Sequence, residues 1–100
     1  MHKKPIRWSP EKNIELMRER SISFEEVLAC IEQGGLLAVL EHPNQQKYPG
    51  QRIWVVKVLA YAHLVPLVES EDEIFLKTIM PSRKATKRFL SEVDDENDEE

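Results

Sequence analysis

Residues 51–70 read QRIWVVKVLAYAHLVPLVES, and this stretch decides the fold of the chain. Branched and aromatic residues dominate it, as is typical of β-strands. Two neighbouring stretches have the same character, LLAVLEH at 36–42 and EIFLKTIM at 73–80. We therefore predict strands over 36–42, 51–62, 63–70 and 73–80. The short connections among the last three favour an antiparallel meander.

Two helices are predicted ahead of these strands, after a short first strand at 6–8. Ser9 is a suitable N-cap, and the proline that follows it suits the first position of a helix over 10–20. Ser23 and Glu26 have the spacing of a capping box at the start of a second helix. That helix should end at the Gly-Gly pair before the next strand.

A third helix is predicted at the end of the stretch KTIMPSRKATKRFL, residues 77–90. Pro81 ends the preceding strand and Ser82 can cap the helix. At 100° per residue, Ala85 and Phe89 share one side. Four cations share the other side: Arg83, Lys84, Lys87 and Arg88. The sequence thus predicts an α+β fold with two N-terminal helices and a C-terminal helix packed on an antiparallel meander.

Charge is unevenly distributed along the 100 residues, whose formal net charge is -4. Residues 92–100 hold 7 of the 18 acidic residues, which leaves 11 acidic against 14 basic residues in 1–91. A run of like charges without aromatics cannot bury enough surface to offset its ordering entropy. We predict a single domain over 1–91, mildly basic, and a disordered acidic tail over 92–100.

Other classes of protein are disfavoured by composition. No apolar run approaches the roughly 20 residues that cross a bilayer, so a membrane protein is not expected. The basic N-terminus has no apolar segment behind it and does not read as a secretion signal. With Cys30 as its one cysteine, the chain fits a reducing compartment, and we expect the cytoplasm. No metal-ligand spacing and no glycine-rich phosphate loop is present, so no cofactor or metal is predicted.

The cationic helix is a candidate phosphate site, since its N-terminus and its basic side chains both favour anions. Lys57 and Lys77 lie within predicted strands, and lysines at such positions of a small sheet suggest a role in binding. The alternative is a solvated helix face that binds nothing in particular.

Three motifs resemble the BrnT family of bacterial type II toxins. They are IRWSPEK at 6–12, ERSISFEEV at 19–27 and SRKATKR at 82–88. The resemblance implies a RelE-like α+β fold, metal-independent cleavage of an RNA substrate and a cognate antitoxin protein. Ser9, Arg20 and Pro81 depart from residues of that family's pattern. These departures favour a second hypothesis, a catalytically silent relative that binds nucleic acid or a protein through the same surface.

Cleavage of RNA without metal needs a base, an acid and cations around the phosphate. Arg83 matches the helical arginine of the family that the chain resembles, and Arg52 corresponds to an arginine on that family's third strand. His42 is the candidate with a suitable pKa, although a histidine beside Pro and Asn can simply order its turn. Tyr61 and Lys77 could donate a proton or hold phosphate, although Tyr61 also fits a core position. Four further cations are predicted to bind RNA: Lys84, Lys87, Arg88 and Lys57.

Two further hypotheses concern partners and regulation. Pro66 favours an edge position or a bulge for its strand. An exposed edge there would suit a larger assembly, such as a homo-oligomer. The tail over 92–100 could compete with nucleic acid for the cationic helix, or it could be a solubilising segment without contacts.

Overall fold

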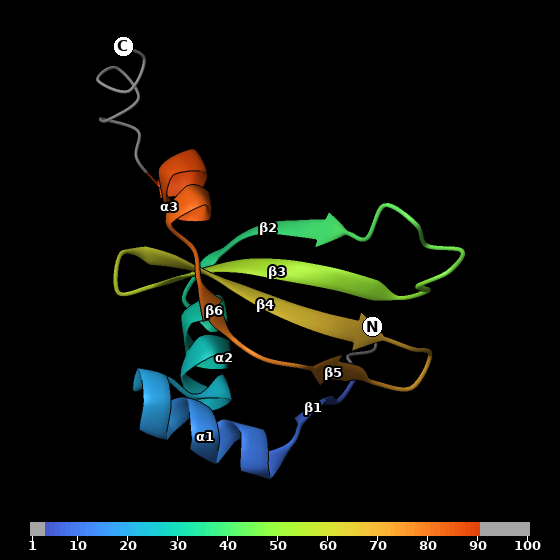
Figure 1. The fold of residues 1–100 in the computed structure, drawn as a ribbon, viewed down its shortest axis with the longest axis horizontal. Coiled ribbons are helices and arrows are strands. Elements are labelled where there is room, and N and C mark those ends of the chain that lie inside the picture. Colours follow the sequence, from blue (N-terminus) through green and yellow to red (C-terminus); the bar gives the residue numbers. More distant parts are fainter. Residues whose placement is uncertain (1–3, 91–100) are drawn as a thin grey trace.

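The computed structural model describes residues 4–90, which form three helices and one sheet of six strands (Figure 1). The strands are β1 (Ile6–Trp8), β2 (Leu36–Glu41), β3 (Gln51–Val58), β4 (Tyr61–Glu69), β5 (Ile74–Leu76) and β6 (Met80–Pro81). The helices are α1 (Pro10–Arg20), α2 (Phe24–Glu32) and α3 (Arg83–Leu90). The α+β class is confirmed. The predicted tail over 92–100 lies outside the described residues.

Local capping sets the ends of the first two helices as the sequence predicts. The Ser9 hydroxyl accepts the Lys12 N–H at 3.2 Å, and α1 runs over the predicted residues 10–20. The Ser23 hydroxyl accepts the Glu26 N–H at 3.1 Å and starts α2. Each hydroxyl satisfies one N–H that has no partner within its helix.

The turn between β3 and β4 lies three residues earlier than predicted. Val58 pairs with Tyr61, so Leu59 and Ala60 form a two-residue turn. Both have positive φ, 53° and 68°, which residues with a Cβ seldom adopt. The sequence prediction was wrong here because such turns normally carry Asn-Gly, and neither residue gives that signal.

The predicted strand over 73–80 is interrupted. Its first part, β5, pairs with the end of β4, and its last part, β6, pairs with the start of β4. Between them, the Lys77 N–H donates to the Pro66 carbonyl at 2.8 Å. In an antiparallel sheet, the N–H and the C=O of one residue point to the same neighbouring strand. The nitrogen of Pro66, which has no hydrogen to donate, therefore points toward the interruption between β5 and β6. Pro66 therefore does not mark an exposed edge, and β4 is interior to the sheet.

The sheet is mixed, with strand order β1-β5-β4-β3-β2. Strands β2 to β5 form the predicted antiparallel meander, but β1 pairs with β5 in parallel. The prediction of a purely antiparallel sheet was wrong in this respect. Parallel neighbours such as β1 and β5 are distant in sequence, so no turn between them signals the pairing.

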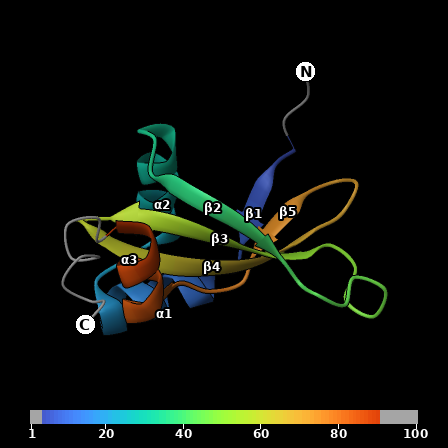
Figure 2. The ribbon, with the colours of Figure 1, turned by 90° about the horizontal axis from the view of Figure 1, so that it is seen from above.

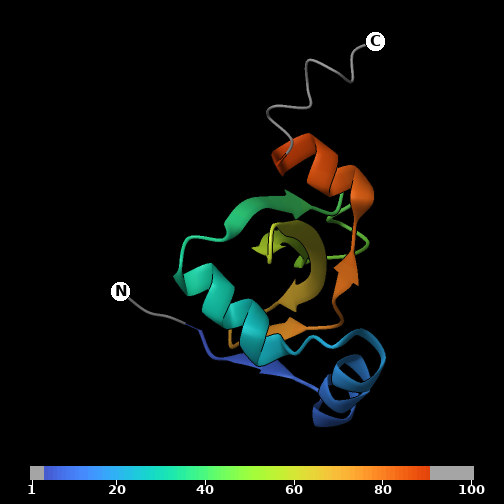
Figure 3. The same ribbon diagram turned by 90° about the vertical axis from the view of Figure 1, so that its left-hand side faces the viewer.

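The sheet separates two apolar clusters. Figure 3 shows α1 and α2 on one side of the sheet and α3 on the other. Helices α1 and α2 cover one face, where Phe24 and Val27 are fully buried. Trp8 stacks on Phe24 with ring centroids 5.3 Å apart, so it packs against this cluster. The shorter α3 covers part of the other face, with Ala85 packed near Val55 and Ala62.

A membrane-crossing helix is not found among residues 4–90, since none of the three is long and apolar enough.

Candidate functional site

Two polar side chains, Ser82 and Thr86, hold α3 on the sheet. The Ser82 hydroxyl accepts the Ala85 N–H at 3.0 Å and caps the helix. Thr86 Oγ1 accepts the Ala62 N–H at 2.8 Å and donates to the Ser82 carbonyl at 2.8 Å. The threonine thus ties α3 to the start of β4, while buried Ala85 faces the sheet.

The outward side of α3 carries the four predicted cations, all exposed. They form two i,i+4 pairs, Arg83 with Lys87 and Lys84 with Arg88. Within residues 4–90, Arg83, Lys84 and Arg88 make no ion pair with a carboxylate. The Arg88 guanidinium lies 5.0 Å from the centre of the Phe89 ring. We call these four residues the α3 cationic face.

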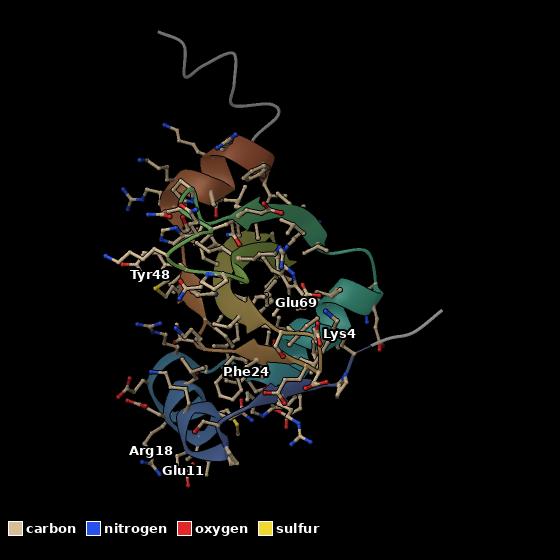
Figure 4. The ribbon with its side chains drawn as sticks, turned by 90° about the vertical axis from the view of Figure 1, so that its right-hand side faces the viewer. Lys4, Glu11, Arg18, Phe24, Tyr48 and Glu69 are labelled. Carbon is tan, nitrogen blue, oxygen red and sulfur yellow. The ribbon has the colours of Figure 1, made fainter. Side chains whose placement is uncertain are left out.

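Arg52 lies elsewhere and is held by two carboxylates. Its guanidinium is 3.0 Å from Glu69 and 3.5 Å from Glu41. The Lys4 ammonium also binds Glu69, at 2.8 Å (Figure 4). The hydrogen bond from Lys4, helped by the charge of Arg52, lowers the pKa of the Glu69 carboxyl. These contacts give Arg52 a structural role across β2, β3 and β4.

His42 lies in the β2–β3 loop, which extends away from α3 (Figure 2). Its Nδ1 accepts the Asn44 N–H at 3.0 Å. Its ring lies against Tyr48, with centroids 4.4 Å apart. These contacts match the alternative in which the histidine orders its turn.

The two predicted strand lysines are separate from one another. Lys57 is exposed on β3 and pairs with Ala62, the residue that Thr86 contacts. Lys77 is exposed in the interruption between β5 and β6. Only Lys57 therefore lies on the strand pair that carries α3.

Tyr61 lines a cavity of about 340 Å³ beside the β3–β4 turn, which we call the hairpin pocket. The pocket lies between the α1–α2 connection and the β4–β6 pair. Its polar lining includes Arg20, Glu26, Tyr61 and His63, and its apolar lining includes Leu59. It brings together residues of five elements, α1, α2, β3, β4 and β6.

His63 is the half-buried histidine of the hairpin pocket. Burial lowers its pKa, while its hydrogen bond to the Tyr61 carbonyl and the Glu26 charge act in the opposite direction. Its Nδ1 lies 3.1 Å from that carbonyl oxygen, and the Tyr61 and His63 rings meet edge to face at 5.9 Å. The neutral ring is thereby favoured near pH 7.

Sequence reasoning missed Arg20, Glu26 and His63 as a group. A turn at Leu59–Ala60 places His63 and Tyr61 on one face of β4, two residues apart. The predicted break after residue 62 put Tyr61 and His63 on two different strands instead. The hairpin register was the missing signal.

Residues 4–90 contain no group of three or more His, Cys, Asp or Glu side chains that could hold a metal ion. Comparison of the chain with protein-family models, curated proteins and solved structures finds no match.

Proposed function

We propose that this chain binds RNA through the α3 cationic face and cleaves it as a metal-independent endoribonuclease, the toxin of a type II toxin-antitoxin pair. The observation that supports the proposal most is the exposure of Arg83, Lys84 and Arg88 without carboxylate partners among residues 4–90. Arginine forks on a fixed helix suit phosphate, which they bind through two hydrogen bonds.

The contrast with Arg52 explains why the α3 cationic face is the stronger candidate. Arg52 already forms ion pairs with Glu41 and Glu69, so a phosphate would have to displace two carboxylates. Arg83 and Arg88 face solvent and would exchange only water and counterions. The helix that carries them is held by buried Ala85 and by Thr86, so binding need not order it.

Binding is tested by fluorescence anisotropy with a labelled single-stranded RNA between 50 and 200 mM salt. Each phosphate neutralised on a single strand contributes about -0.7 to the slope of log K against log salt. Four cations predict a slope of about -3, and Arg83→Gln with Arg88→Gln should reduce its magnitude by about 1.4. The charge-matched control is Arg7→Gln with Arg18→Gln, because Arg18 lies on α1, across the sheet from α3 (Figure 4). Equal slopes for the two double variants would refute the interface.

Cleavage is tested with the same RNA in the presence of a chelator, and in growing bacteria that express the chain. Product that resists the chelator, with growth arrest that a cognate antitoxin reverses, supports the toxin assignment.

The catalytically silent alternative is favoured by one observation: Arg52 and His42, two of the predicted catalytic residues, are occupied by structural contacts. Salt-dependent binding without cleavage or arrest would select it.

A further inference from the structure

The hairpin pocket holds polar groups with unused hydrogen-bonding capacity. Arg20 and Glu26 line the same cavity, yet no salt bridge joins them, and the Glu26 carboxylate has no ion pair within residues 4–90. The Tyr61 hydroxyl and His63 Nε2 make no hydrogen bond to another described residue. Glu26 and His63 are half-buried, whereas Arg20 and Tyr61 are exposed, so these groups are accessible to a ligand that enters the cavity.

The hydrogen bond of His63 determines which ring nitrogen can react. A carbonyl oxygen only accepts, so Nδ1 must carry the proton that it donates to the Tyr61 carbonyl. The lone pair of the neutral ring is then on Nε2. This arrangement, an imidazole oriented through Nδ1 with Nε2 open, is what a general base requires.

Arg20 supplies a fixed cation at the rim of the pocket. Its Nη1 donates to the Ile79 carbonyl at 2.6 Å, which holds the guanidinium in place at the end of α1. A guanidinium has five N–H donors, so several remain for an anion. Glu26 lies close enough to His63 to favour a positive charge on its ring.

We propose that the hairpin pocket is the acid–base site of the proposed ribonuclease and takes one ribonucleotide with its 3′-phosphodiester. This assignment rests on the proposed function. His63 Nε2 accepts the 2′-OH proton as the 2′-oxygen bonds to phosphorus. The bond from phosphorus to the 5′-oxygen breaks, and the Tyr61 hydroxyl protonates that oxygen. Arg20 binds the charged phosphoryl oxygens, and the products are a 2′,3′-cyclic phosphate and a 5′-OH.

A short segment of chain joins this pocket to the α3 cationic face around the edge of the sheet. Pro81 lines the pocket and pairs with His63 across β4 and β6. Arg83 follows two residues later, at most about 7 Å along the chain. An RNA strand that crosses Pro81 can therefore place one phosphate in the pocket and the next ones on α3.

A titration of the full chain with nucleoside 3′-monophosphates tests the pocket without requiring turnover. Histidine ring resonances are followed by NMR, with Arg20→Gln as the comparison variant. We expect nucleotide to shift the His63 resonances and raise its pKa, because a bound phosphate favours the imidazolium. The His42 resonances should not respond, and Arg20→Gln should reduce the nucleotide-induced shift of the His63 resonances at least tenfold. A response at His42 alone would overturn the assignment.

Cleavage by variants separates this inference from the proposed function. His63→Gln should lower kcat by 10²-fold or more, with RNA affinity within about twofold of the wild type. Glu26 is a positioning residue, so Glu26→Gln should move the acidic limb of the pH–rate profile to lower pH, whereas Glu32→Gln on the same helix should not. Wild-type rates in His63→Gln would overturn the pocket and leave the ribonuclease standing. RNA that the wild type binds but never cleaves would overturn both.

Discussion

The β3–β4 turn gives a direct test of the energetics of this fold. Leu59 and Ala60 adopt left-handed conformations, which cost about 1–2 kcal/mol for a residue with a Cβ. Asn and Gly adopt this conformation readily, and Asn-Gly is the preferred pair in such turns. Leu59 is 87% exposed, so its replacement removes little packing. Part of the gain is offset because Gly loses about 0.5–1 kcal/mol more entropy on folding.

Leu59→Asn combined with Ala60→Gly should therefore raise the free energy of unfolding by about 2 kcal/mol. For a domain of this size that corresponds to a melting temperature roughly 8–16 °C higher. Thermal unfolding followed by circular dichroism measures the change. Leu59→Ala is the matched control, since it removes the side chain and keeps the strained backbone, and its melting point should barely change. A double variant that melts at or below the wild-type temperature would refute the strain argument.

Two further predictions concern buried polar contacts and pH. Asn13 Oδ1 accepts the buried Phe24 N–H at 2.8 Å and its Nδ2 donates to Glu25 Oε1 at 2.8 Å, so Asn13→Ala should cost about 1–3 kcal/mol in urea unfolding. Asn13→Asp keeps the acceptor but sets a second carboxylate beside Glu25, so it should not recover this loss. The folded pKa of Glu69 lies below its unfolded value because Lys4 binds the carboxylate, so its stabilisation is present above the unfolded pKa and is lost as pH falls through the folded one. The difference in unfolding free energy between the wild type and Glu69→Gln should shrink from pH 7 to pH 3, and a constant difference would contradict it.

Features that depend on neighbouring residues were predictable from the sequence. Capping hydroxyls and helical periodicity are local, and the structure has α1 where they place it, over 10–20. The outward cations of α3 follow from the same periodicity, since Ala85 and Phe89 are the positions that face the sheet. Local chemistry of this kind needs no knowledge of the partner surface.

Features that depend on register were not predictable. The β3–β4 turn is imposed by strand pairing on residues with no preference for it, and moving it by three residues changes which side chains share a face. Tyr61 and His63 were consequently assigned to two different strands, although both lie on β4. The hairpin pocket depends on this pairing, and so its composition could not be seen in the sequence.

The interruption opposite Pro66 shapes the wall of that pocket. Leu67 pairs with Leu76 and Leu64 pairs with Met80, so four steps on one strand match three on the other, which defines a one-residue bulge. An extra residue reverses the faces of everything that follows it. In the observed register Ile79 is fully buried beside the helices, and the next residue on that face, Pro81, meets the pocket. Without the bulge Met80 would point to the helices instead, and the pocket would lose the wall that leads into α3.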